Sequence, residues 1–287
     1  MKSLFAIGYL LLVSTLLARQ EPDWKGVQDV FGRKGTIQSG MLKETFPRND
    51  LNVKVGEVDV SPRLALTSWI AFRLMDTVAM AMGDMVLLEP EIGPVMKKLL
   101  ADGVEVSALH NHIINETPKV MYMHFGGRGN PVQLATTLND ALALTGTPLG
   151  PPPLEKTDKL SITDWSQVRS IMGSNGQGYG NVLQFSYPRS EEVVENGMAL
   201  PPFLGTATGI NIQMVGQKAA TTGDFVLLAS EVNPVAKALA DNGIAVTAIH
   251  NHMLNENPRL FMMHFWGYDD PSAIARALRK ALDVIRK

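Results

Sequence analysis

Two stretches, ALHNHIINETPKVMYMHF at 108–125 and AIHNHMLNENPRLFMMHF at 248–265, align without a gap and decide how this chain is organised. The correspondence extends to most of the sequence around them; for example, Gly83-Asp84 corresponds to Gly223-Asp224. Self-similarity over more than 100 residues indicates a tandem duplication of one domain-sized unit in this 287-residue chain.

The N-terminal segment predicts that the protein is exported. Lys2 precedes an apolar run from Leu4 to Leu17, the order typical of a signal peptide. The run is shorter than the roughly 20 residues of a membrane span. We expect a signal peptide at 1–20, no stable membrane anchor after its cleavage, and a periplasmic or secreted protein; an uncleaved anchor is the alternative. The remaining chain divides into repeat 1 at 21–148, a proline-rich linker at 149–160, and repeat 2 at 161–287.

Composition narrows the class of protein. With 45% apolar and 19% charged residues the chain is expected to be globular. A net charge of −2 with scattered basic residues argues against nucleic acid as a partner, because such binders concentrate lysine and arginine on one face. Cysteine is absent, so a metal site has to use histidine, carboxylate, amide or methionine ligands.

The same pattern of elements is expected in both repeats. A helix opens each unit, and extended segments follow, with Gly83-Asp84 and Gly223-Asp224 as hairpin turns. A helix is expected from Pro94 and from Pro234, then two strands and a closing helix. Strand hairpins alternating with helices predict an α+β fold, with an antiparallel or mixed sheet covered by helices in each unit. We expect the two units to pack on each other.

The histidines carry the strongest functional signal. All six lie in the two quoted stretches: His110, His112 and His124, and their counterparts His250, His252 and His264. Residues two apart on a strand share a face, and a hairpin loop at 115–119 would set His110 opposite His124. Each repeat is therefore predicted to gather three imidazoles on one patch of its sheet, although pooling of the two sets into one site stays open.

Three neutral imidazoles suit a divalent transition metal, zinc or copper above all, with one coordination position left open. A metal-free polar pocket for a small molecule and a purely structural hydrogen-bond network are the alternatives. Met121, Met123, Met253, Met262 and Met263 lie beside the histidines. They are interpreted as core residues in preference to soft copper ligands.

Two glutamates and two arginines are further candidates. Glu91 and Glu231 precede the predicted helices at Pro94 and Pro234, where a carboxylate serves equally well as a metal ligand, a general base or a helix-dipole partner. Arg48 and Arg189 follow prolines at matching positions and are suited to bidentate binding of a carboxylate or phosphate, with a solvated or ion-paired arginine as the equal alternative.

The Gly-Asp-X-Val-Leu-Leu, Ala-Leu/Ile-His-Asn-His and Pro-(five residues)-His-Phe motifs resemble those of the bacterial LppY/LpqO family of exported proteins. The resemblance covers nearly everything after residue 22 and implies an exported tandem-domain protein, but it implies no reaction. The leading hypothesis is an exported metalloprotein with metal-assisted hydrolysis as its chemistry, and the alternative is a non-catalytic carrier of metal or of a small ligand. A structural envelope protein is the third hypothesis.

Overall fold

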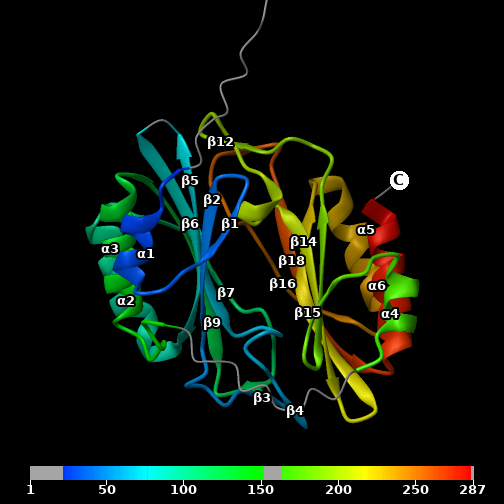
Figure 1. The fold of residues 1–287 in the computed structure, drawn as a ribbon. Coiled ribbons are helices and arrows are strands. Elements are labelled where there is room, and N and C mark those ends of the chain that lie inside the picture. Colours follow the sequence, from blue (N-terminus) through cyan, green and yellow to red (C-terminus); the bar gives the residue numbers. More distant parts are fainter. Residues whose placement is uncertain (1–21, 76, 152–162, 286–287) are drawn as a thin grey trace, which may run out of the picture.

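The computed structural model describes residues 22–75, 77–151 and 163–285. The predicted signal peptide and most of the predicted linker lie outside these residues. Each repeat forms a six-stranded antiparallel sheet with helices on one face. The bare faces of the two sheets are turned toward each other, and the helices form the two outer layers (Figure 1). The predicted α+β class with two similar units is confirmed, and each six-stranded sheet is antiparallel throughout.

The two sheets have the same strand order. The first runs β1 (Thr36–Gln38), β2 (Met41–Pro47), β5 (Thr67–Met75), β6 (Val78–Leu88), β9 (Val120–Gly129) and β7 (Glu105–His110). The second runs β10 (Gln177–Tyr179), β11 (Val182–Pro188), β14 (Ala207–Val215), β15 (Lys218–Leu227), β18 (Phe261–Asp269) and β16 (Ala245–His250). Two small sheets close the ends: β3 (Lys54–Val55), β4 (Val58–Asp59) and β8 (Glu116–Thr117), and their counterparts β12 (Val194–Glu195), β13 (Met198–Ala199) and β17 (Glu256–Asn257).

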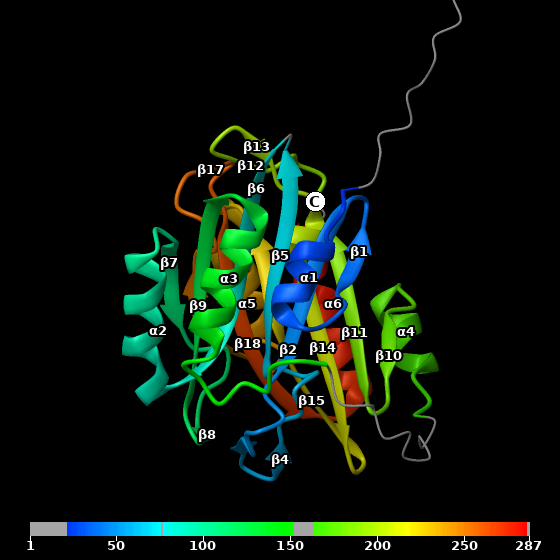
Figure 2. The same ribbon diagram turned by 60° about the vertical axis from the view of Figure 1, so that its left-hand side comes forward.

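Three helices cover each sheet. They are α1 (Lys25–Phe31), α2 (Glu89–Ala101) and α3 (Pro131–Leu142) in the first repeat, which lie over the outer face of its sheet (Figure 2), and α4 (Ser166–Met172), α5 (Ala229–Ala240) and α6 (Pro271–Ile285) in the second. A short 3-10 helix, η1 (Pro202–Leu204), follows β13. No helix within the described residues is long and apolar enough to cross a membrane.

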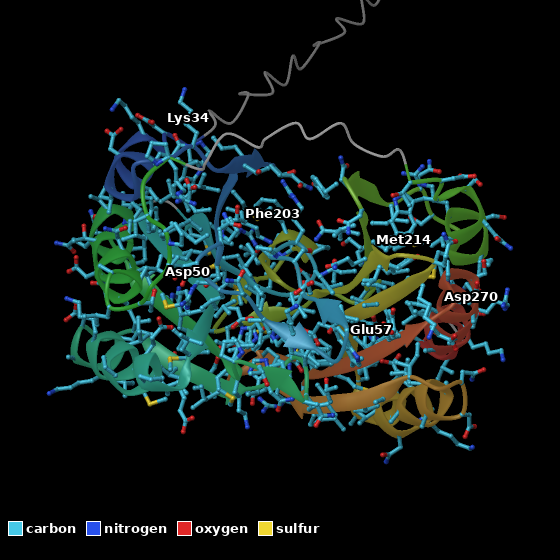
Figure 3. All side chains as sticks on the ribbon, turned by 90° about the horizontal axis from the view of Figure 1, so that it is seen from below. Lys34, Asp50, Glu57, Phe203, Met214 and Asp270 are labelled. Atoms are coloured by element: carbon cyan, nitrogen blue, oxygen red, sulfur yellow. The ribbon has the colours of Figure 1, made fainter. Side chains whose placement is uncertain are left out.

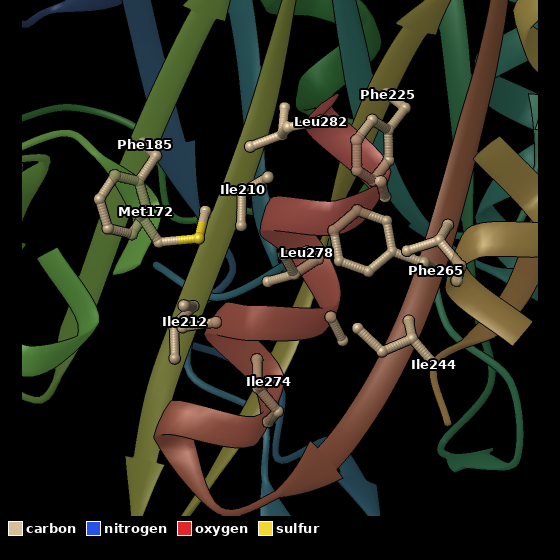
Figure 4. Close-up of a cluster of buried hydrophobic side chains, with 14 of the residues drawn as sticks. Met172, Phe185, Ile210, Ile212, Phe225, Ile244, Phe265, Ile274, Leu278 and Leu282 are labelled. Carbon is tan, nitrogen blue, oxygen red and sulfur yellow. The ribbon is translucent and has the colours of Figure 1, made fainter. Parts of the chain in front are cut away.

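The outer core of each repeat lies between its helices and its sheet. In the second repeat Ile274, Leu278 and Leu282 of α6 pack on Ile210 and Phe265 of the sheet (Figure 4). The spacing of these α6 residues places them on one helical face, which the sequence pattern indicates. All five are at most 2% exposed, so this packing fixes the helix layer against the sheet.

The helices expected from Pro94 and Pro234 begin earlier, at Glu89 and Ala229. The carboxylate of Glu91 accepts the N–H of Leu88 at 2.7 Å, which satisfies one free donor at the start of α2. Pro94 then lies inside the helix, where it removes a single N–H donor close to the first turn. The sequence prediction was wrong about the start because it gave proline more weight than the cap.

The predicted hairpin turns at Gly83-Asp84 and Gly223-Asp224 are also wrong, since both dipeptides lie inside the long central strands β6 and β15. The glycines serve close packing. A Cβ atom at Gly83 would lie 2.2 Å from the carbonyl oxygen of Trp69 and 2.6 Å from the ring of Phe125. Glycine in these strands therefore marks a close approach of neighbouring chain and not a turn.

Residues of both repeats share the core between the two sheets. One apolar cluster joins Met80 and Met82 of β6 to Val226 and Met262 of the second sheet. Viewed along the interface, the helices of the repeats lie on opposite sides, while Glu57 and Phe203 lie between them (Figure 3). The two repeats therefore pack as one unit around a common inner core.

Candidate histidine site

All six histidines meet at the junction of the two sheets. Three pairs of rings join the repeats, with centroids 3.7, 3.7 and 3.9 Å apart: His110 with His250, His112 with His264, and His124 with His252. His110 and His250 occupy equivalent positions of the repeats, and exchanging the repeats converts the His112–His264 pair into the His252–His124 pair, so the cluster lies on the approximate two-fold axis of the duplication. The two predicted patches are therefore one site.

Strand pairing explains how the first set converges. His110 pairs with Tyr122 and not with His124, and a bulge between Val106 and Ala108 shifts the register. The predicted pairing was thus displaced by two residues. A displacement of two keeps every side chain on its original face, because the side-chain period of a strand is two. The rings of His110 and His124 consequently still stack, with centroids 5.1 Å apart.

Hydrogen bonds between the repeats hold the segments that follow β7 and β16. The hydroxyl of Ser107 donates to the carbonyl of His252 at 2.6 Å, and that of Thr247 donates to the carbonyl of His112 at 2.6 Å. Asn111 also donates to the carbonyl of Thr247 at 3.0 Å. The same side-chain amide donates to the carbonyl of Ile113 at 3.1 Å, so Asn111 fixes its own turn as well as the contact across the interface.

Backbone carbonyls fix the orientation of several rings. Nδ1 lies 3.2 Å from the Gly83 oxygen in His124, 2.7 Å from the Gly223 oxygen in His264, and 3.1 Å from the Gly205 oxygen in His252. A carbonyl only accepts, so each Nδ1 carries the hydrogen, and in the neutral rings of His124 and His264 Nε2 then presents its lone pair to the cluster. A ring N–H held by a backbone carbonyl is typical of metal-ligating histidine.

The inner nitrogens lack ordinary partners. Nε2 of His112, His124 and His250 is buried with no hydrogen bond to another protein group. The Nε2 atoms of His110 and His264 face each other at 3.2 Å. Buried polar atoms without partners are rare in folded proteins, and these nitrogens could serve as ligand atoms for a metal ion.

Two aspartates complete the cluster. Oδ2 of Asp84 lies 3.3 Å from Nε2 of His112, and Oδ2 of Asp224 lies 2.9 Å from Nε2 of His252. Asp84 pairs across the strands with His124, and Asp224 with His264. Sequence reasoning missed both residues because Gly-Asp resembles a turn; the signal that could have found them is the apolar stretch that follows each dipeptide in both repeats.

Burial controls protonation in the cluster. Burial, reinforced by the neighbouring imidazoles, holds the pKa of His110, His112 and His124 far below its usual range. The pKa of His250 falls to about 4 for the same first reason. These rings are neutral at physiological pH, which is the form that binds metals.

The two carboxyls differ in their electrostatics. Burial raises the pKa of Asp84 to about 7. Burial also opposes ionisation of Asp224, but His264 and His252 outweigh it and hold its pKa below the usual value. Although burial disfavours the charged imidazole of His252, the adjoining Asp224 carboxylate raises its pKa. Asp224 and His252 therefore each favour the charged form of the other.

Three groups of histidines have their ligand atoms within 4.8 Å of one another. One group is the set predicted for the first repeat: His110, His112 and His124. The other two mix the repeats: His110 with His250 and His264, and His124 with His250 and His252. The set predicted for the second repeat is thus divided between two mixed groups. Histidines of both repeats therefore combine in the groups whose geometry could hold a metal ion.

Glu91 and Glu231 lie at the helix starts and contact other groups. Glu91 Oε2 accepts from Arg48 Nη1 at 2.8 Å, and Glu231 Oε2 accepts from Arg189 Nη1 at 2.7 Å. Arg48 is fully buried and also binds Asp50. Both arginines thus form ion pairs within the protein, which is the alternative to binding a ligand, and both glutamates have the contacts of helix-cap and ion-pair residues.

Four of the five methionines that neighbour the histidines in sequence are core residues, as expected, whereas Met121 is only half-buried. Met123 belongs to the outer core of the first repeat, and Met263 to that of the second. Met253 and Met262 lie in the inner core between the sheets.

Fold and site together define a class of protein: a duplicated α+β unit whose repeats face each other and join their histidines in one buried centre. The chain belongs to the family described as Domain of Unknown Function (DUF1259), whose profile matches residues 25–144 and again 166–284. The two matches agree with the two repeats of the structure.

Other comparisons add little. No curated protein matches the sequence. A trimeric bacterial microcompartment shell protein, PduB, is 11% identical over 88% of this chain and 89% of its own, with a TM-score of 0.22. EtuB from Clostridium kluyveri is 11% identical over 87% of this chain and 88% of its own, with a TM-score of 0.20. Scores this low carry no argument about fold or function.

Proposed function

We propose that this protein binds a transition-metal ion at a single centre to which both repeats contribute histidines. The observation that carries the proposal is the convergence of imidazole Nε2 atoms that are buried and lack hydrogen-bond partners. Neutral imidazole is a good ligand for zinc, copper, iron and nickel. The backbone carbonyls that hold Nδ1 of His124, His252 and His264 keep these rings in the ligating tautomer.

The charge of the site supports the same proposal. Asp84 and Asp224 are the carboxylates that adjoin the histidines. Their negative charge would balance a divalent cation, and an approaching cation would favour ionisation of Asp84, whose pKa is raised in its absence. A structural hydrogen-bond network explains this arrangement less well, because it leaves several ring nitrogens without partners.

Zinc and copper are the metals that we propose first. Three or four imidazoles with a carboxylate in reach are a common environment for either ion. We place binding or transfer of the metal ahead of hydrolysis, because the glutamates that suggested a general base are held by Arg48 and Arg189.

We also propose that the chain is exported to the periplasm or secreted, as the LppY/LpqO-like motifs and the apolar N-terminal run suggest. Cell fractionation of the full-length protein, with N-terminal sequencing of the mature form, tests this. Recovery from the cytoplasm with an intact N-terminus would contradict it.

The test of metal binding is elemental analysis of protein purified without a histidine tag, beside a His110→Gln/His250→Gln double variant. We expect stoichiometric metal in the natural protein and its loss in the variant, with both showing a cooperative melting transition. Only traces of metal in the natural protein, also after incubation with zinc or copper, would contradict the proposal. Histidines with a purely structural role would instead lower the melting temperature with no metal bound in either protein.

A further inference from the structure

A cavity of about 280 Å³ reaches the histidine cluster from one side. Residues of β6, β7 and β9 form one wall, and the turn at Glu195-Asn196 and residues 252–254 form the other. His252, whose ring lies 3.9 Å from that of His124, is part of the lining. The cavity thus connects the edge of the proposed metal centre with the space beside β9.

Strand register shows how the cavity continues from the centre. Consecutive cross-strand pairs on the inner face of the first sheet are Asp84 with His124, then Met82 with Gly126, then Met80 with Arg128. The first pair belongs to the histidine cluster, and the other four residues line the cavity. Because Gly126 has no side chain, nothing from β9 fills the space between the cluster and the exposed Arg128.

The second repeat closes the same route. The equivalent pairs are Asp224 with His264, then Thr222 with Trp266, then Ala220 with Tyr268. Trp266 and Tyr268 pack against the inner apolar cluster that contains Ala220. The replacement of Gly126-Gly127-Arg128 by Trp266-Gly267-Tyr268 is one of the clearest divergences between the repeats, and it falls on the path to the site.

Gly126 is not required for backbone reasons. Its φ lies outside the left-handed region, and a Cβ atom there would have no heavy atom within 4 Å. Neither strain nor close packing therefore explains the glycine, in contrast to Gly83. Its remaining effect is to leave the cavity open.

The lining indicates what the cavity accepts. Met80, Met82 and Met253 contribute thioethers, and Met253 follows His252 directly. Thioethers are soft ligands that favour Cu(I) over zinc. At the positions of Met80 and Met82 the closed side has Ala220 and Thr222, so thioethers accompany the open route only. Glu105 and Glu195 add carboxylates to the wall, and Arg128 is turned to the carbonyl of Asn196.

We infer that this cavity is the path by which a soft metal ion, Cu(I), reaches and leaves the composite histidine centre, with Gly126 as its open gate and the methionines as transient ligands. The inference rests on the proposed metal-binding function. It further implies that exchange occurs from the side of the first repeat, while Trp266 seals the other side.

The test compares the rates at which the protein releases metal to a chelator that absorbs visible light once it binds the metal. Release of Cu(I) is measured under anaerobic reducing conditions, and release of Zn(II) is measured separately. The natural protein is measured beside Gly126→Trp, Met80→Leu/Met82→Leu and the control Gly93→Trp. Gly93 lies in α2, has open space around its Cβ position and does not line the cavity. Circular dichroism and total metal content check that each variant folds and loads.

We expect Gly126→Trp to slow release of both ions at least about tenfold, because release then requires local opening of the interface. Met80→Leu/Met82→Leu should slow exchange of Cu(I) about tenfold and leave Zn(II) unchanged, since leucine has a similar volume but no sulfur. Gly93→Trp should change neither rate.

Each other outcome is informative. Unchanged release from a metal-loaded Gly126→Trp protein would overturn the path and leave the proposed function intact. Equal effects of the methionine variant on both ions, or no effect, would overturn the assignment to Cu(I). Failure of the natural protein to bind either ion would instead overturn the proposed function itself.

Discussion

Replacing Glu231 by glutamine separates a catalytic carboxylate from a structural one. The substitution keeps the size of the side chain and an oxygen that can accept the N–H of Leu228, now at 2.7 Å. It removes the negative charge that faces Arg189 Nη1 at 2.7 Å. Arg189 is 4% exposed and Glu231 15%, so the ion pair is mostly desolvated.

The expected cost follows from that burial. Removing one partner of a fully buried ion pair destabilises a protein by about 3–5 kcal/mol. Arg189 retains Glu191 at 3.1 Å, an exposed partner, so we expect about 2 kcal/mol for Glu231→Gln. In a protein of this size that corresponds to a fall in melting temperature of about 4–8 °C.

Thermal denaturation and metal competition titrations are the assays. Glu231→Gln should melt earlier and bind metal with unchanged affinity. Asp224→Asn is the matched control: it should weaken metal binding about 10–100-fold, because Asp224 adjoins His252 at 2.9 Å. Loss of metal affinity in Glu231→Gln without loss of stability would show instead that the Glu231 carboxylate acts at the metal site.

Three further results are expected of the metal-free protein. Acid should destabilise the metal-free protein, because five of the six histidines have a pKa below the usual value. Below pH 6.5 the unfolded chain therefore binds more protons than the folded protein. Stability is lost as the pH falls toward the pKa of His250, which is about 4. The raised pKa values of Asp84 and Glu44, both about 7, act in the opposite sense, but these two groups are outnumbered by the five histidines. We expect the free energy of unfolding to fall by on the order of 3 kcal/mol per pH unit near pH 5.5, as measured by urea denaturation. An unfolding free energy that stays constant from pH 7 to 5 would contradict this expectation. Gly83→Ala should cost about 4 kcal/mol or more, or yield insoluble protein, because its Cβ would lie 2.2 Å from a carbonyl oxygen; a melting temperature equal to the natural one would refute that role. Asn111→Ala should cost about 1–3 kcal/mol through its two lost hydrogen bonds, and hydrogen exchange should show greater opening on both sides of the interface; opening confined to the first repeat would be inconsistent with the bond to Thr247.

Much of the fold follows from the sequence because its signals are local. The duplication, the α+β class and the apolar face of α6 each depend on periodicity or on self-similarity. The predicted convergence of His110 and His124 was correct although the predicted strand register was not, because a displacement by two residues leaves each side chain on the same face.

The sequence pattern could not predict that histidines of both repeats meet in one site. Whether His250 contacts His264 of its own repeat or His110 of the other is decided by how two sheets pack, and strand pattern determines only which face each side chain occupies. Asp84 was missed for a related reason. Its glycine neighbour is required by the backbone of Trp69 on the next strand, a contact that local sequence does not reveal.

The most direct test of one shared centre is metal content after a change in one repeat only. His250 contributes to two of the three ligand groups, and its ring stacks on His110 at 3.7 Å. We expect His250→Gln alone to remove or greatly weaken all metal binding by the full chain, and His110→Gln to do the same. Retention of half the metal at natural affinity in either variant would show two independent sites and rule out one shared centre.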